Sequence, residues 1–294
     1  MRELAGPTIA GIPLIHEADG LVFLNPMLDR EWNGGPARHP PLRIRHVERA
    51  PSRDGLVALV SAPPPQGTVC LDAAGELAIF ADVVDRRGAP QLLRTVRRGH
   101  EYEIHYAHGE AADHWQGYWA RTAFAYALTG RGLGVLAHAA GVRLPGGGVL
   151  LCPGASGVGK STLAALLAED LGPGAEVLSD DRVALVEESG VLRAYGTPWR
   201  SAAGQAAPGA GPLAAICFVR HGGPPALRPL PTEAATPKLL KALMLPFWSS
   251  SEMATLLERL DTIVRAAPAF EFSYAPRPGA GRWLADALAA ERAA

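Results

Sequence analysis

The stretch LCPGASGVGKST, residues 151–162, constrains the fold of this chain more than any other. Its glycines at 154 and 159, followed by Lys160 and Ser161, match the spacing G-x-x-x-x-G-K-[ST]. In a loop of this kind, successive backbone N–H groups point inward at phosphate oxygens, and glycine allows backbone angles that a Cβ disfavours. The stretch therefore predicts a phosphate-binding loop, with Lys160 reaching the β- and γ-phosphates and Ser161 binding Mg²⁺.

The residues on either side of this loop agree with the interpretation. GGVLLCP, residues 147–153, predicts a short buried strand, and STLAALLAED, residues 161–170, has apolar residues at helical spacing. Strand, glycine loop and helix thus occur in the required order. The alternative is a glycine-rich turn with a chance lysine, and the complete eight-residue pattern in this setting argues against it.

Composition limits the classes of protein to consider. The chain has 294 residues, of which 48% are hydrophobic and 19% charged, as expected for a soluble globular protein of one large or two modest domains. A net charge of −1 gives no global attraction to nucleic acid or to an anionic membrane, so neither is expected as a partner, and phosphate affinity must be local.

Cysteine usage and the N-terminal residues bear on the compartment. Cys70, Cys152 and Cys217 are widely spaced and form no C-x-x-C pair, which argues against a disulfide framework or a zinc site and favours a reducing environment. The N-terminal residues lack the pattern of a signal peptide, and no apolar run approaches 18 residues. We therefore expect a cytoplasmic protein.

The first part of the chain predicts a small β-rich domain over residues 1–110. Short apolar or alternating runs are broken there by Pro, Gly and Asp, and they predict an antiparallel arrangement of strands. The predicted strands are 8–16, 21–26, 42–48, 68–72, 76–84 and 101–108. Residues 113–129 change to a helical period, with a face of Trp115, Tyr118, Trp119, Thr122 and Tyr126. We expect this face to pack in a core or between domains, and the alternative is that its aromatic side chains stack on a cofactor.

The second part predicts a mixed α/β domain over residues 111–294. Adjacent strands are expected at 133–144 and 146–153, and residues 175–196 predict a strand, an acidic pair, a strand, a turn and a strand. Further strands are expected at 212–222, 226–230 and 269–274, and helices at 232–245, 250–267 and 281–292. Several of these strands are joined by turns too short for a crossover, which predicts mixed strand directions.

The acidic pair Asp180–Asp181 follows an apolar strand and comes 20 residues after Lys160. A Mg²⁺ ion held by a loop hydroxyl normally takes a further carboxylate, a role that we assign to Asp180. A second carboxylate can accept the proton of an attacking hydroxyl, a role that we assign to Asp181 and that a kinase needs in addition to nucleotide binding. The alternative for the pair alone is a solvated strand end.

A histidine, then G-x-S-G-x-G-K-S, then a DD pair on the next strand resembles the HPr kinase/phosphorylase family, which is related to the ATP-dependent phosphoenolpyruvate carboxykinases. The likeness is greatest to HPr-kinase-like proteins of bacterial gene clusters, some of which phosphorylate ribosomal peptides. It covers residues 130–200 clearly and the rest of the C-terminal half loosely. The resemblance implies a C-terminal domain of this fold and ATP with Mg²⁺ as its ligands.

Carried over by position, the resemblance implies active-site roles for Lys160, Asp180, Asp181 and His138, a histidine that otherwise reads as a core residue. It also implies that the nucleotide phosphates are bound by the whole loop and the start of the helix. These residues are Gly154, Ala155, Ser156, Gly157, Val158, Gly159, Lys160, Ser161 and Thr162.

The chain also departs from the true HPr kinases. Thr162 stands where they have glutamate, and Arg193 and Tyr195 stand where the glutamate and arginine of their downstream signature would fall. These departures argue against HPr as the substrate and against the reverse phosphorylase reaction. Arg200 and Lys238 are basic candidates for neutralising transition-state charge.

Two functions from different classes follow. The first is an ATP-dependent kinase acting on a serine-like hydroxyl of a peptide, a protein or a small molecule, with Asp181 as the base. The second is a non-catalytic ATP-binding sensor or regulatory module. The second aspartate favours the kinase, since a sensor needs only the metal carboxylate. The N-terminal domain could dock a peptide or mediate assembly, and assembly through it would give a homo-oligomer.

Overall fold

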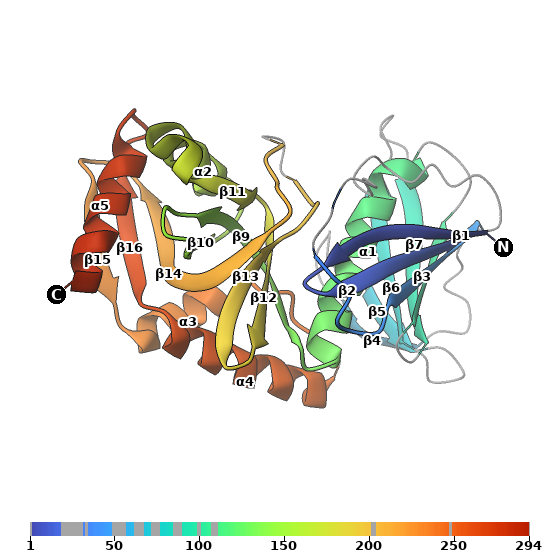
Figure 1. The fold of residues 1–294 in the computed structure, drawn as a ribbon. Coiled ribbons are helices and arrows are strands. Elements are labelled where there is room, and N and C mark those ends of the chain that lie inside the picture. Colours follow the sequence, from blue (N-terminus) through green and yellow to red (C-terminus); the bar gives the residue numbers. More distant parts are fainter. Residues whose placement is uncertain are drawn as a thin grey trace. The chain divides into compact units, whose positions relative to one another are not determined.

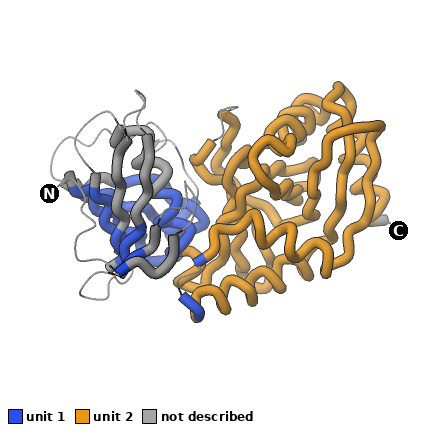
Figure 2. The backbone as a smooth tube through the Cα atoms, turned by 180° about the vertical axis from the view of Figure 1, so that it is seen from behind, with its two compact units in different colours: residues 1–127, 246–250 blue, residues 128–245, 251–294 orange. Residues whose placement is uncertain are grey.

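The structure is a computed structural model that describes residues 2–18, 32, 35–48, 57–61, 68–71, 77–84, 90–98, 101–106, 111–200, 204–246 and 249–293. The chain divides into two compact units, residues 1–127 with 246–250 and residues 128–245 with 251–294 (Figure 2). The sequence predicts a boundary after residue 110 between two independently folding domains. The division into compact units does not test independent folding, so this boundary stays a prediction.

The first unit contains an eight-stranded sheet in the order β1-β2-β3-β8-β7-β6-β5-β4 (Figure 1). The strands are β1 (Arg2–Ile9), β2 (Ile12–Ala18), β3 (Leu42–Glu48), β4 (Val57–Ser61), β5 (Thr68–Leu71), β6 (Leu77–Val84), β7 (Pro90–Arg98) and β8 (Glu101–Tyr106). The prediction of an antiparallel sheet is wrong, because β3 pairs in parallel with both β2 and β8. Antiparallel pairing follows from short turns between consecutive strands, and β3 and β8 are neighbours in space although four strands separate them in the chain.

The predicted strand 8–16 is in fact split by a hairpin turn. β1 ends at Ile9 and β2 begins at Ile12, and these two residues are paired across the hairpin. Ala10 and Gly11 between them have φ values of 50° and 76°, as a two-residue turn between right-twisted strands requires. The predicted strand 21–26 lies outside the described residues.

Helix α1 (Ala111–Gly130) confirms the helix predicted over 113–129. Thr122 and Tyr126 are buried, as expected for a packed face. The side chains of Trp115, Tyr118 and Trp119 lie outside the described part of the helix.

The second unit is a mixed sheet with helices on both faces (Figure 1). Its strands are β9 (Gly134–Arg143), β10 (Val149–Pro153), β11 (Glu176–Ser179), β12 (Arg182–Glu188), β13 (Val191–Gly196), β14 (Ala210–His221), β15 (Ala226–Leu230) and β16 (Ala269–Tyr274). Its helices are α2 (Lys160–Leu171), α3 (Thr232–Leu240), α4 (Ser250–Ala266) and α5 (Ala280–Ala293), and a short 3₁₀ turn, Gly172–Gly174, follows α2. The predicted mixed α/β class is confirmed, and each strand and helix expected after residue 130 is present.

The sheet order is β10-β9-β12-β13-β14-β16-β15, and an additional parallel pairing of β10 with β14 closes the first five strands into a ring. β14 also pairs in parallel with β16. The carboxyl ends of β10, β14 and β16 therefore lie at one edge of the sheet, where α/β proteins commonly bind ligands.

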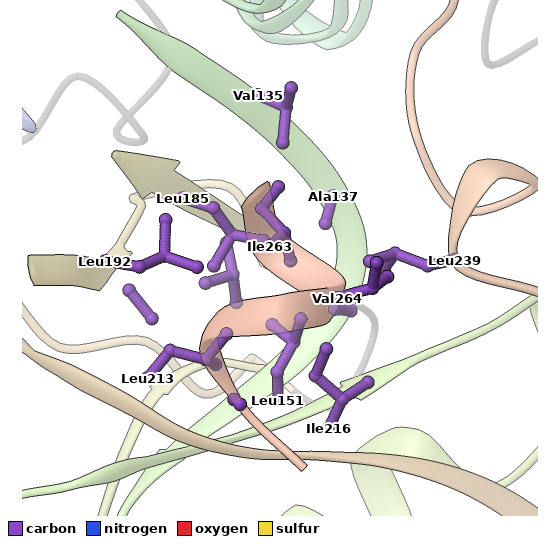
Figure 3. Close-up of a cluster of buried hydrophobic side chains, with 14 of the residues drawn as sticks. Val135, Ala137, Leu151, Leu185, Leu192, Leu213, Ile216, Leu239, Ile263 and Val264 are labelled. Atoms are coloured by element: carbon purple, nitrogen blue, oxygen red, sulfur yellow. The ribbon is translucent and has the colours of Figure 1, made fainter. Parts of the chain in front are cut away.

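Two hydrophobic clusters fix this arrangement. In the first, side chains of β9, β10 and β12–β14 pack against α3 and α4, with Leu151 and Ile216 facing Ile263 and Val264 (Figure 3). In the second, the other face of β10, β14 and β16 packs against α2 and α5. β10 is buried along its whole length, so the loop that follows it starts from a rigid strand.

Candidate active site

The predicted phosphate loop connects the end of β10 at Pro153 to the start of α2 at Lys160. Gly157 and Gly159 have φ values of 82° and 99°, which residues with a Cβ rarely adopt. The N–H of Gly154 donates to the backbone oxygen of His138 over 3.1 Å, which ties the start of the loop to β9. The strand, loop and helix order expected from the sequence is confirmed.

The amino end of α2 is open for an anion. Gly159 is the residue before the helix, no side chain caps the helix start, and no acidic residue occupies its first turn. The first helical hydrogen bond runs from Leu163 N–H to Gly159 O over 2.9 Å, so the N–H groups of residues 160–162 precede the helical ladder. These groups and the helix dipole favour a negative charge at this position. The side chain of Thr162 is exposed on the same turn.

Lys160 brings a positive charge into this loop. The residue is only 5% exposed, and its Nζ donates to the backbone oxygen of Ala155 over 2.8 Å. Burial lowers the pKa of Lys160, and the negative charge of Asp181 partly opposes that shift. A buried ammonium with one hydrogen-bond acceptor is suited to a phosphate group, which would supply both charge and further acceptors.

The acidic pair lies between β11 and β12, where Ser179 organises the backbone. The Ser179 hydroxyl donates to Trp199 O over 3.3 Å and accepts from the N–H groups of Asp181 and Arg182, at 3.3 and 3.0 Å. Ser161 Oγ donates to Asp180 O over 3.2 Å, so the acidic pair contacts the start of α2. β10 and β11 are not neighbours in the sheet, since both strands pair with β9, which lies between them.

His138 and Asp181 are brought together by the pairing of β9 with β12. His138 is aligned with Arg182 in this register, and its Nε2 lies 3.3 Å from Asp181 Oδ1. Arg182 Nη1 contacts the same Oδ1 at 2.6 Å. The hydrogen bond to Asp181 raises the pKa of His138, but burial and the charges of Arg182 and Lys160 outweigh it, so the pKa lies below the usual value. A neutral imidazole is therefore favoured at pH 7.

The oxygen atoms needed for Mg²⁺ are present beside the loop. Asp180 is 1% exposed, and the N–H of Gln205 lies 3.5 Å from its Oδ2. Its neighbour Ser161 adds a hydroxyl, and both are hard oxygen donors of the kind that Mg²⁺ prefers. Within the described residues no three His, Cys, Asp or Glu side chains gather as a metal cage. One carboxylate and one hydroxyl fit an ion that takes its other ligands from phosphates and water.

The basic candidates Arg200 and Lys238, and the two residues at the positions of the downstream HPr kinase signature, make other contacts. Lys238 Nζ lies 3.6 Å from Glu271 Oε2 and 5.7 Å from the centre of the Phe218 ring. Arg200 is exposed and directly follows Trp199, which accepts from Ser179. Arg193 and Tyr195 both contact Glu188 across the β12–β13 hairpin.

Two residues that contact the loop were not expected from the sequence. His221 Nε2 lies 3.4 Å from Gly157 O, and Tyr274 Oη lies 3.3 Å from Gly159 O. Each residue ends a strand, β14 or β16, that runs parallel to β10 or to its neighbour. Neither belongs to a sequence motif, and only the parallel pairing of these strands brings them to the loop.

A cavity of about 620 Å³ lies elsewhere in this unit. Its lining includes Pro268, Ala269 and Thr232, at the amino ends of β16 and α3. The loop lies at the carboxyl ends of the parallel strands, so this cavity belongs to the other edge of the sheet.

Comparison with known proteins adds a distant structural similarity. No protein-family model and no curated protein matches the chain. Among solved structures, the HPr(Ser) kinase/phosphatase from Coxiella burnetii matches with 14% identity and a TM-score of 0.31, over 53% of this chain and 89% of that chain.

In the described part of the chain, no helix combines the length and the apolar character needed to cross a bilayer.

Proposed function

We propose that the chain is an ATP-dependent kinase that transfers the γ-phosphoryl group to a serine-like hydroxyl of a peptide, a protein or a small molecule. The observation that supports this most is the combination of an uncapped helix start with the buried Lys160, next to the acidic pair Asp180–Asp181, whose backbone accepts from Ser161 of the same helix start. The first two features favour a polyphosphate. The second carboxylate is what a transferase needs beyond binding.

Each residue would have a distinct task. The backbone N–H groups of residues 157–162 and the Lys160 ammonium would orient the phosphates and stabilise the negative charge on the transferred group. Asp181 would accept the proton of the acceptor hydroxyl as its oxygen bonds to the γ-phosphorus and the bond to the bridging oxygen breaks, releasing ADP. His138, 3.3 Å from Asp181, would hold this carboxylate in place.

Ser161 and Asp180 are the residues that would hold Mg²⁺. When bound, the ion would neutralise phosphate charge that the protein groups do not reach. Asp180 is buried, its backbone oxygen accepts from Ser161 at the helix start, and the N–H of Gln205 lies 3.5 Å from its Oδ2. Division of the two aspartates into a metal ligand and a base is supported by their different surroundings, since Asp181 contacts His138, whereas the carboxylate of Asp180 lies 3.5 Å from the N–H of Gln205.

A non-catalytic ATP sensor is the second candidate, and one contact favours it. Arg182 Nη1 lies 2.6 Å from Asp181 Oδ1, and a carboxylate held by a guanidinium is a weaker base. In a sensor this ion pair would not have to break. In a kinase the acceptor hydroxyl would have to use the carboxylate in spite of this pair.

The experiment that separates the two is phosphoryl transfer from γ-labelled ATP with Mg²⁺. Pools of serine-containing peptides and small hydroxyl compounds are incubated with the protein, and the label in each acceptor is measured. The matched control is Asp181→Asn, which keeps the size of the side chain. Labelled acceptor with the wild type and not with the variant supports the kinase. Nucleotide binding without any transfer supports the sensor.

A further inference from the structure

We propose that His221 and Tyr274 are positioning residues that hold the outer side of the phosphate loop, so that two of its N–H groups point at the phosphates. This inference rests on the proposed nucleotide site and adds residues that no loop motif includes. Both side chains approach carbonyl oxygens of the loop, at 3.4 Å for Gly157 and 3.3 Å for Gly159.

The geometry of the peptide bond links these contacts to phosphate binding. In a trans peptide, the carbonyl of one residue and the N–H of the next point in opposite directions. A donor that holds Gly157 O from outside therefore turns the N–H of Val158 the other way, toward the inside of the loop. The contact to Gly159 O adds to the helical bond from Leu163 N–H and so helps to orient the N–H of Lys160, the first residue of α2.

Both side chains are suited to donate. A carbonyl oxygen only accepts, so the contact to Gly157 requires the hydrogen of His221 on Nε2. Tyr274 is fully buried, and burial, followed by the charges of Cys152 and Cys217, raises its pKa to about 12. Its hydroxyl therefore keeps its hydrogen at neutral pH.

The loop itself is shaped to accept these neighbours. A Cβ placed on Gly159 would lie 2.8 Å from Cε1 of His221, closer than non-bonded carbons approach. The rings of His221 and Tyr274 are stacked, with centres 6.5 Å apart and planes inclined by 30°. Phe272 continues the stack behind Tyr274 at 5.1 Å. The glycine thus admits the histidine ring, and the buried aromatic side chains of β16 support it.

Titration calorimetry tests this proposal with two ligands, Mg·ATP and Mg·tripolyphosphate. His221→Ala should bind both about fivefold more weakly than the wild type, the effect of one hydrogen bond of ordinary strength. His221→Gln, whose amide can reach the same carbonyl, should restore most of the affinity. Tyr274→Phe, which keeps the buried ring, should weaken the binding of both ligands to a similar extent. Arg220→Ala, one residue earlier and paired with Glu271, is the control that should bind as the wild type.

The outcomes distinguish the possible failures. If the wild type binds both ligands and His221→Ala binds them equally well, the positioning role is wrong. If His221→Ala loses affinity for ATP and keeps it for tripolyphosphate, the histidine contacts the nucleoside and the proposal is overturned. If the wild type binds neither ligand, the proposed nucleotide site fails and this inference fails with it.

Discussion

Replacement of Lys160 with methionine should have different effects on the stability of the ligand-free protein and on its affinity for Mg·ATP. Methionine keeps an unbranched apolar side chain and removes the ammonium, which donates to Ala155 O over 2.8 Å. In the ligand-free protein Lys160 is only 5% exposed, so desolvation of its ammonium offsets much of that hydrogen bond. We expect the free energy of unfolding to change by less than about 1 kcal/mol.

The effect on nucleotide binding should be much larger. A hydrogen bond to a charged group contributes about 1.5–3 kcal/mol, and the phosphates would replace Ala155 O as the partner of Lys160. Loss of that interaction corresponds to roughly 10- to 150-fold weaker binding of Mg·ATP. Stability and affinity should therefore respond very differently to the same substitution.

Thermal unfolding and isothermal titration of Mg·ATP measure the two effects on the same samples. Arg265→Met is the matched control, since it also removes a cation, from an exposed pair with Asp261 on α4. This control should keep the nucleotide affinity of the wild type. Wild-type affinity in Lys160→Met would refute the assignment of the loop as the phosphate site.

Three further predictions concern the loop, the helix that follows it and the first unit. Gly159→Ala should weaken nucleotide binding in titration, because its φ of 99° strains any residue with a Cβ and the 2.8 Å approach of His221 would force the histidine ring to shift; wild-type affinity would contradict this. Asp170→Ala should lower the unfolding free energy by about 1–3 kcal/mol in urea titrations, because its carboxylate accepts three backbone N–H groups at the start of α5; unchanged stability would show that water replaces them. Burial, with a contribution from His46, lowers the pKa of His16 to about 3, and burial lowers the pKa of His46 to about 4. Below about pH 6.5, these histidines therefore take up protons in the unfolded chain but not in the folded unit. Stability measured by urea unfolding should then fall as the pH is lowered from 7 to 5, by about 2 kcal/mol for each histidine, and a flat profile would contradict this.

Local pattern was enough to predict the elements around the site. The strand before Gly154, the helix from Lys160 and the acidic turn at Asp180 are each encoded within about ten consecutive residues. In these segments the hydrophobic period and the turn residues agree, so tertiary contacts do not override them.

Non-local pairing could not be predicted in the same way. His138 meets Asp181 only because β9 and β12 pair in one particular register, and a shift by one residue would turn the histidine to the other face. The parallel pairing of β10 with β14, and of β14 with β16, likewise brings His221 and Tyr274 to the loop. The sequences of β14 and β16 predict ordinary buried strands, and nothing in them indicates that their last residues contact the loop.

The measurement that tests the central claim most directly compares Asp181→Asn with Asp180→Asn. Mg·ATP is titrated into both variants, and phosphoryl transfer or slow ATP hydrolysis is measured in parallel. Asp181→Asn should bind with little change and lose turnover by about 10² to 10⁴, the usual contribution of a general base. Asp180→Asn should weaken the Mg²⁺ dependence of binding itself. The account is contradicted if Asp181→Asn loses nucleotide binding while Asp180→Asn keeps both binding and turnover.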